Sequence, residues 1–177
     1  MITSLTTRDS SFLWLYPTTQ EISPFTLIID FDGLFFTTQS AETQSLTPCA
    51  QTISPAHFNA TLHFLHDCVK KGHRLLSITT LTSSFFDFLK AAPQTDLLFS
   101  YFNEIICTDT IGLKKSNPLT MSYVLKKHMI APNKCIVIDD QPTTLHSAHE
   151  AGISKTILCK NSNLSGIRHQ LTAYGVL

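Results

Sequence analysis

From residue 25 onward, short apolar runs alternate with longer stretches in which apolar residues recur every three or four positions. The short runs are bounded by turn residues and are almost continuously apolar, which is typical of strands buried on both faces of a parallel sheet. The predicted strands are residues 25–30, 75–78, 104–107, 134–138 and 155–159.

The stretches between these runs predict helices. The clearest helix begins with Ser54 as N-cap and Pro55 in its first turn, and it ends at Gly72. Its expected buried face carries Phe58, Leu62, Leu65 and Val69. Further helices are predicted over residues 83–89, 117–127, 143–151 and 164–174, and residues 97–102 form an apolar turn or a helix. Strands that alternate with helices indicate an α/β fold, a doubly wound parallel sheet of about five strands flanked by helices.

The segments outside this alternation are polar. Residues 1–24 are rich in Ser and Thr around one aromatic cluster, and we expect a lead-in segment that packs Trp14 against the domain. The domain itself is expected to span residues 25–177, with a long polar loop or flap at 34–54. Loops of that length in a compact domain are usually functional or mobile, so residues 37–54 could form a small lid.

Composition excludes several classes of function. The chain has 177 residues, 43% hydrophobic and 15% charged, and 13 basic residues balance 13 acidic ones. No general attraction to nucleic acid or to anionic membranes follows, so neither is an expected partner. The five cysteines form no C-x-x-C pair, which argues against a structural zinc site, and Cys107 and Cys135 lie in apolar runs as expected core thiols. With no signal-peptide pattern and no membrane-spanning run, we expect a cytoplasmic protein, although export by a specialised route stays open.

Acidic residues stand where two of the buried strands end. Asp30 and Asp32 follow the first strand, on the same side of the pleat, and Gly33 then permits a sharp turn. Asp139 and Asp140 follow the fourth strand. Buried carboxylates need a partner, and a divalent cation is one such partner, although Asp-x-Asp-Gly alone fits an ordinary turn equally well. Doubly wound sheets bind ligands at this carboxyl edge.

The order of these features resembles the haloacid dehalogenase-like (HAD) superfamily of hydrolases, most of which are phosphatases with a Rossmannoid fold. The resemblance covers roughly residues 25 to 160. The motifs that carry it are residues 27–33, residues 75–80 with Thr79 as the hydroxyl, Lys115 ahead of Asn117-Pro118, and residues 136–140 with 149–152 downstream.

The resemblance implies a mechanism for phosphomonoester hydrolysis. Asp30 would be the nucleophile that forms an aspartyl-phosphate, and Asp32 the general acid and base. The acid at position 32 favours phosphoryl transfer over dehalogenation. Mg²⁺ would be held by Asp30, the backbone carbonyl of Asp32 and Asp140, with Asp139 orienting ligands or water behind them. The phosphate group would be bound by Gly33, Thr79, Thr80 and Lys115.

Some positions depart from the family pattern and leave alternatives open. Thr80 replaces a frequent Asn, and Thr144 replaces a frequent acid. Lys114 competes with Lys115 for the lysine role, and Ser77 competes with Thr79 for the hydroxyl role, although Ser77 falls mid-strand and is expected to face the core. His63 and His66 fit a solvated helix surface better than a metal site.

The resemblance also bears on the substrate. Many family members insert a cap domain that selects the substrate, but the segments between Gly33 and Gly72, and between Thr80 and Lys115, are too short for a full cap. An open site suits a bulky substrate, such as a phosphoprotein, a sugar conjugate or, less well given the neutral charge, a nucleic-acid end; alternatively a second copy closes it in a homo-oligomer. The expected partner is a phosphorylated substrate, either a small molecule or a phosphoprotein. The alternatives are a phosphotransferase, or a binding or scaffold protein that keeps the fold without useful turnover.

Overall fold

A computed structural model describes residues 24–31, 55–90, 93–160 and 163–177. Five parallel strands form one sheet with the order β3-β2-β1-β4-β5, which confirms the predicted doubly wound sheet. The strands are β1 (Thr26–Asp30), β2 (Arg74–Thr79), β3 (Glu104–Cys107), β4 (Cys135–Asp139) and β5 (Lys155–Leu158). β1 lies in the centre, and the order reverses there, because the chain adds β2 and β3 on one side and β4 and β5 on the other.

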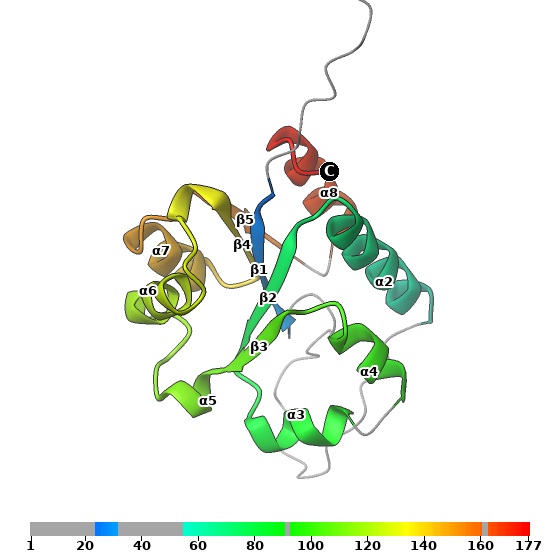
Figure 1. Cartoon of the computed structure of the whole chain (residues 1–177), viewed down its shortest axis with the longest axis horizontal. Coiled ribbons are helices and arrows are strands. Elements are labelled where there is room, and N and C mark those ends of the chain that lie inside the picture. The colour runs from blue at the N-terminus through cyan, green and yellow to red at the C-terminus, as the bar shows by residue number, and fades with distance from the viewer. Residues whose placement is uncertain (1–23, 32–54, 91–92, 161–162) are drawn as a thin grey trace, which may run out of the picture.

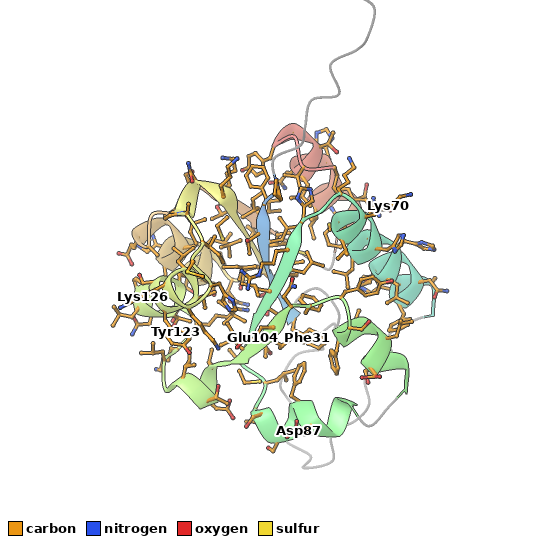
Figure 2. The ribbon with its side chains drawn as sticks, viewed as in Figure 1. Phe31, Lys70, Asp87, Glu104, Tyr123 and Lys126 are labelled. Atoms are coloured by element: carbon orange, nitrogen blue, oxygen red, sulfur yellow. The ribbon has the colours of Figure 1, made fainter. Side chains whose placement is uncertain are left out.

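Helices cover both faces of the sheet (Figure 1). Side chains of α2, α3, α4 and α8 pack on one face, and those of α6 and α7 pack on the other. The helices are α2 (Pro55–Lys70), α3 (Ser83–Lys90), α4 (Pro93–Phe99), α5 (Thr108–Ile111), α6 (Pro118–Lys127), α7 (Pro142–Glu150) and α8 (Leu164–Ala173), with a 3-10 turn η2 (Pro132–Lys134) before β4. The outer side of α6 is open to solvent, where Tyr123 and Lys126 project (Figure 2).

Alternation along the strands divides the core into two layers. In β1, Leu27 and Ile29 face α2 and α8, whereas Ile28 faces α6 and α7. In β4 the side chains alternate in the same way: Ile138 lies on the side of α2 and α8, and Val137 lies on the side of α6 and α7. This period of two decides on which side of the sheet each strand-ending acid lies, and it places Asp30 and Asp139 on the α6–α7 side.

The buried face of α2 differs from the prediction. Thr61, Phe64, Leu65 and Cys68 are fully buried, whereas Val69 is 43% exposed and Phe58 and Leu62 are only partly buried. The buried stripe is shifted by about one residue from the predicted one. It was hard to recognise in the sequence because it contains the polar Thr61 and the small Cys68. His63 and His66 are exposed, as expected. The four-residue helix α5 was not predicted, because it is a single turn that follows β3 directly.

Between Thr80 and Lys115 the described residues form α3, α4, β3 and α5, and the absence of a full cap stays a prediction. Of the lead-in predicted over residues 1–24, residues 1–23, including Trp14, lie outside the described residues, as does the whole of the loop or flap at 34–54. Among the helices that the structure describes, none is both long and apolar enough to cross a membrane.

Candidate active site

Two buried carboxylates meet at the carboxyl edge of the sheet, at the ends of the neighbouring strands β1 and β4. Ile29 pairs with Ile138 in the register, so Asp30 and Asp139 are the next residues along each strand. They are only 5% and 1% exposed. Phe31, which is fully buried, belongs to the core layer on the α2 and α8 side, where its ring centroid lies 5.3 Å from that of Phe86. The alternation of side chains thus turns Asp30 toward the α6–α7 side.

Lys115 lies between these two carboxylates. It belongs to the loop that joins α5 to α6, and only 7% of its surface is exposed. Its Nζ forms salt bridges with Asp30 and with Oδ2 of Asp139, the second at 2.8 Å. Lys114, the competing candidate, is exposed. The structure therefore brings Lys115 to the acids, as the spacing to Pro118 predicts.

The charges in this cluster shift one another's protonation. Burial raises the pKa of Asp139 to about 6, a rise that Lys115 opposes and the Asp30 carboxylate reinforces. Burial and the charge of Asp30 also raise the pKa of Asp140. For Lys115, burial works toward a lower pKa, but the combined attraction of Asp30 and Asp139 is larger and leaves the pKa raised. The lysine is therefore held as a cation, while the acids resist being ionised together.

Three acids of the described residues could hold a metal ion. Asp30, Asp139 and Asp140 each offer a carboxylate oxygen, and these oxygens all lie within 4.8 Å of one another. Carboxylate oxygens are the hard ligands that Mg²⁺ prefers, and a cation would oppose both the burial and the repulsion from Asp30 that raise the pKa values of Asp139 and Asp140. The residues present therefore fit a Mg²⁺ ion.

Asp139 is held on several sides. Its Oδ1 accepts a hydrogen bond from the backbone N–H of Gln141 at 2.8 Å, and its Oδ2 contacts Lys115. Its carbonyl oxygen accepts a hydrogen bond from the N–H of Cys159 at 2.9 Å, just past the end of β5. The direct contact with Lys115 was not anticipated from the sequence, because it depends on a loop that is distant along the chain.

The predicted hydroxyl positions lie at the end of β2. Thr79 is fully buried as the last residue of the strand, and its Oγ1 accepts a hydrogen bond from the N–H of Leu81 at 3.1 Å. Thr80 follows and is exposed. Ser77 is buried in mid-strand, as expected. Asp32 and Gly33, the other predicted site residues, lie outside the described residues.

The profile of the family described as haloacid dehalogenase-like hydrolase matches residues 54–158, more than half of the chain. The chain belongs to this family. Solved structures that share the HAD fold include an uncharacterized protein from Corynebacterium glutamicum (TM-score 0.61, 11% identity, 88% of this chain and 98% of that one). Another is a HAD-family enzyme from Bacteroides thetaiotaomicron in complex with magnesium and inorganic phosphate (TM-score 0.62, 14% identity, 82% and 99% covered).

Among curated proteins, the HAD chain is similar to the phosphoglycolate phosphatase of Aliivibrio fischeri, with 32% identity over 92 residues. The aligned part is 52% of this chain and 38% of that enzyme. The phosphoglycolate phosphatase of Vibrio vulnificus matches with 27% identity and the same coverage. The chain thus spans well under half the length of the curated relatives that it matches.

Proposed function

We propose that this HAD protein is a Mg²⁺-dependent phosphatase that hydrolyses a phosphomonoester through an aspartyl-phosphate on Asp30. The observation that carries the proposal is the cluster at the end of β1 and β4, in which Lys115 contacts Asp30 and Asp139 while Asp140 lies within metal-binding reach. Phosphoryl transfer needs charge neutralisation around a positioned nucleophile, and this cluster supplies acids and a buried cation together.

Each residue then has a distinct role. Asp30 attacks the phosphorus atom, and the Lys115 ammonium offsets the negative charge of the nucleophile and of the phosphoryl oxygens. Mg²⁺, when bound, would neutralise phosphoryl charge, with Asp30, the carbonyl of Asp32 and Asp140 as its protein ligands. Because both carboxylate oxygens of Asp139 are engaged by Gln141 and Lys115, Asp139 is assigned to orienting the lysine and the metal ligands.

The remaining roles belong to residues of the motifs at 27–33 and 75–80. Asp32 would protonate the leaving oxygen and then activate the water that hydrolyses the acyl phosphate. Thr79, at the buried end of β2, would donate its hydroxyl hydrogen to a phosphoryl oxygen, with Gly33 and Thr80 contributing to the phosphate site. The activity of the curated relatives supports a small phosphorylated molecule as substrate, and phosphoglycolate is the first compound to try.

The test is phosphate release by the purified protein from an aryl phosphate and from phosphoglycolate, with Mg²⁺ or with EDTA. We expect Mg²⁺-dependent release that falls by at least about a hundredfold in Asp30→Asn, since the amide cannot act as the nucleophile. Asp96→Asn, a matched change at an exposed position of α4, should leave the rate unchanged. Mg²⁺ binding without hydrolysis of any phosphate ester in a broad panel would refute the proposal and favour a binding protein.

A further inference from the structure

In the loop that carries Lys115, the carbonyl oxygen of Lys115 accepts a hydrogen bond from the hydroxyl of Ser147 at 3.5 Å, and the backbone just before it is held at the carbonyl oxygen of Lys114. This oxygen accepts a hydrogen bond from the N–H of Asn117 at 2.9 Å, which closes a turn. It accepts a second hydrogen bond, at 2.7 Å, from the hydroxyl of Thr120. Thr120 lies in the first turn of α6 and is fully buried. A side chain of the helix thus holds the backbone immediately before the lysine.

This contact is unusual for a threonine near a helix N-terminus. Threonine hydroxyls in helices commonly bond to carbonyls three or four residues earlier, within the same helix. Thr120 instead reaches six residues back, beyond the Asn117 cap, to the loop. Asn117 caps the helix on its own, since its side chain accepts a hydrogen bond from the N–H of Leu119 at 3.0 Å. The Thr120 hydroxyl is therefore not needed as a cap, and its bond serves the loop.

The peptide unit explains why the Lys114 carbonyl matters for Lys115. The Lys114 carbonyl lies in one rigid plane with the nitrogen and the Cα of Lys115, so holding the oxygen also fixes the position of the Cα atom from which the Lys115 side chain leaves. A lysine side chain has a flexible four-carbon stem. Its ammonium can meet Asp30 and Asp139 together only if the base of that stem stays in place.

We propose that Thr120 is a positioning residue for Lys115: its hydroxyl, acting through the Lys114 carbonyl, keeps the lysine ammonium between Asp30 and Asp139. The inference rests on the proposed function for its effect on turnover, but its effect on Lys115 itself is independent of that function. Without the hydroxyl, the carbonyl keeps its bond from Asn117, so the turn persists while the peptide plane gains freedom.

The experiment compares Thr120→Val, which removes the hydroxyl at nearly constant volume, with Thr120→Ser, which keeps it. Thr61→Val is the matched control, because Thr61 is also buried and its hydroxyl has no hydrogen-bond partner within the part of the chain that the structure describes. Two kinds of measurement are made on the full chain: steady-state kinetics, which give kcat and KM for an aryl phosphate with Mg²⁺, and the side-chain ¹⁵N–¹H signal of the Lys115 ammonium. That signal is assigned by its loss in Lys115→Met.

We expect Thr120→Val to lower kcat about tenfold with little change in KM, because the misplaced ammonium acts on the transition state more than on binding. We expect the same variant to shift or broaden the Lys115 signal. Thr120→Ser should restore both, and Thr61→Val should change neither. If Thr120→Val does not fold, Thr120→Ala takes its place.

A Lys115 signal that stays unchanged in Thr120→Val overturns the proposal, whereas an altered signal with unchanged kcat in an active enzyme overturns only the expected effect on turnover. A wild-type protein without any phosphatase activity would refute the proposed function but not the positional role, which the ammonium signal still decides. An effect of Thr61→Val equal to that of Thr120→Val would show a general packing effect and would also overturn the proposal.

Discussion

Replacing Lys115 by methionine removes the buried cation while keeping the length of an unbranched side chain. The ammonium contacts two carboxylates that are almost inaccessible to water, so its loss leaves Asp30 and Asp139 facing each other in a medium that screens poorly. Removing one partner of a buried ion pair typically costs about 3–5 kcal/mol. We therefore expect the free energy of unfolding of Lys115→Met, without metal, to be lower by about that amount near neutral pH.

The pH dependence of this deficit has a definite sign. The pKa of Asp139 is already raised from 3.8 to about 6, and losing Lys115 removes an influence that lowers it, so the pKa rises further. When the pKa of an acid is higher in the folded state than in the unfolded state, the folded state binds more protons, so the protein loses stability as the pH rises from the unfolded pKa through the folded pKa. The deficit of Lys115→Met should therefore be smallest near about pH 4.5 and largest above about pH 7.

The assay is urea unfolding monitored by far-ultraviolet circular dichroism, at about pH 4.5 and about pH 7, with EDTA or with excess MgCl₂. Lys114→Met is the control: that lysine is exposed, and its replacement should change the free energy of unfolding by no more than about 0.5 kcal/mol. Mg²⁺ should stabilise Lys115→Met more than the wild type, because a bound cation replaces the lost charge. Equal stability of Lys115→Met and Lys114→Met at neutral pH, or a deficit that shrinks as the pH rises, would refute this electrostatic account.

Three further changes test other parts of the structure. Burial lowers the pKa of His128, and so does the charge of Arg74, whose guanidinium donates to Nδ1 of His128 at 2.7 Å. The free energy of unfolding of the wild type should therefore fall as the pH drops below about 6.5, more steeply than that of His128→Gln. Urea titrations at several pH values measure both, and parallel curves would contradict this expectation. Met129 has φ 54° and is 93% exposed, so Met129→Gly should raise the free energy of unfolding by about 0.5–1 kcal/mol, and a loss would show an unrecognised contact. Asp67→Asn, which breaks a largely exposed pair with Arg168, should cost at most about 0.5 kcal/mol, less in high salt; a larger, salt-insensitive loss would contradict it.

The sequence by itself determined the architecture, because the strands are short, mostly apolar runs separated by helical patterns, and the central strands β1, β2 and β4 are buried along almost their whole length. The runs at 104–107 and 134–138 match β3 and β4 within one residue at either end. The acids at the ends of two such runs have no role in the core, and they led to the prediction of a site at the carboxyl edge of the sheet, where the structure brings Asp30 and Asp139 to Lys115. Cys135, which lies in one of these apolar runs, is buried as expected, and burial raises the pKa of its thiol to about 12.

Only the tertiary structure decided which face of α2 is buried and what each polar group at the site touches. The stripe of Thr61, Phe64 and Cys68 has no strong periodic signal, because a hydroxyl and a thiol interrupt it. The contact of Lys115 with Asp139 joins segments whose approach depends on how α6 packs beside β4, and the bond from Thr120 to Lys114 depends on the path of the loop before α6. A local pattern records which residues must be buried, whereas the partners of a buried charge depend on loop geometry that is set only when the helices and sheet have packed.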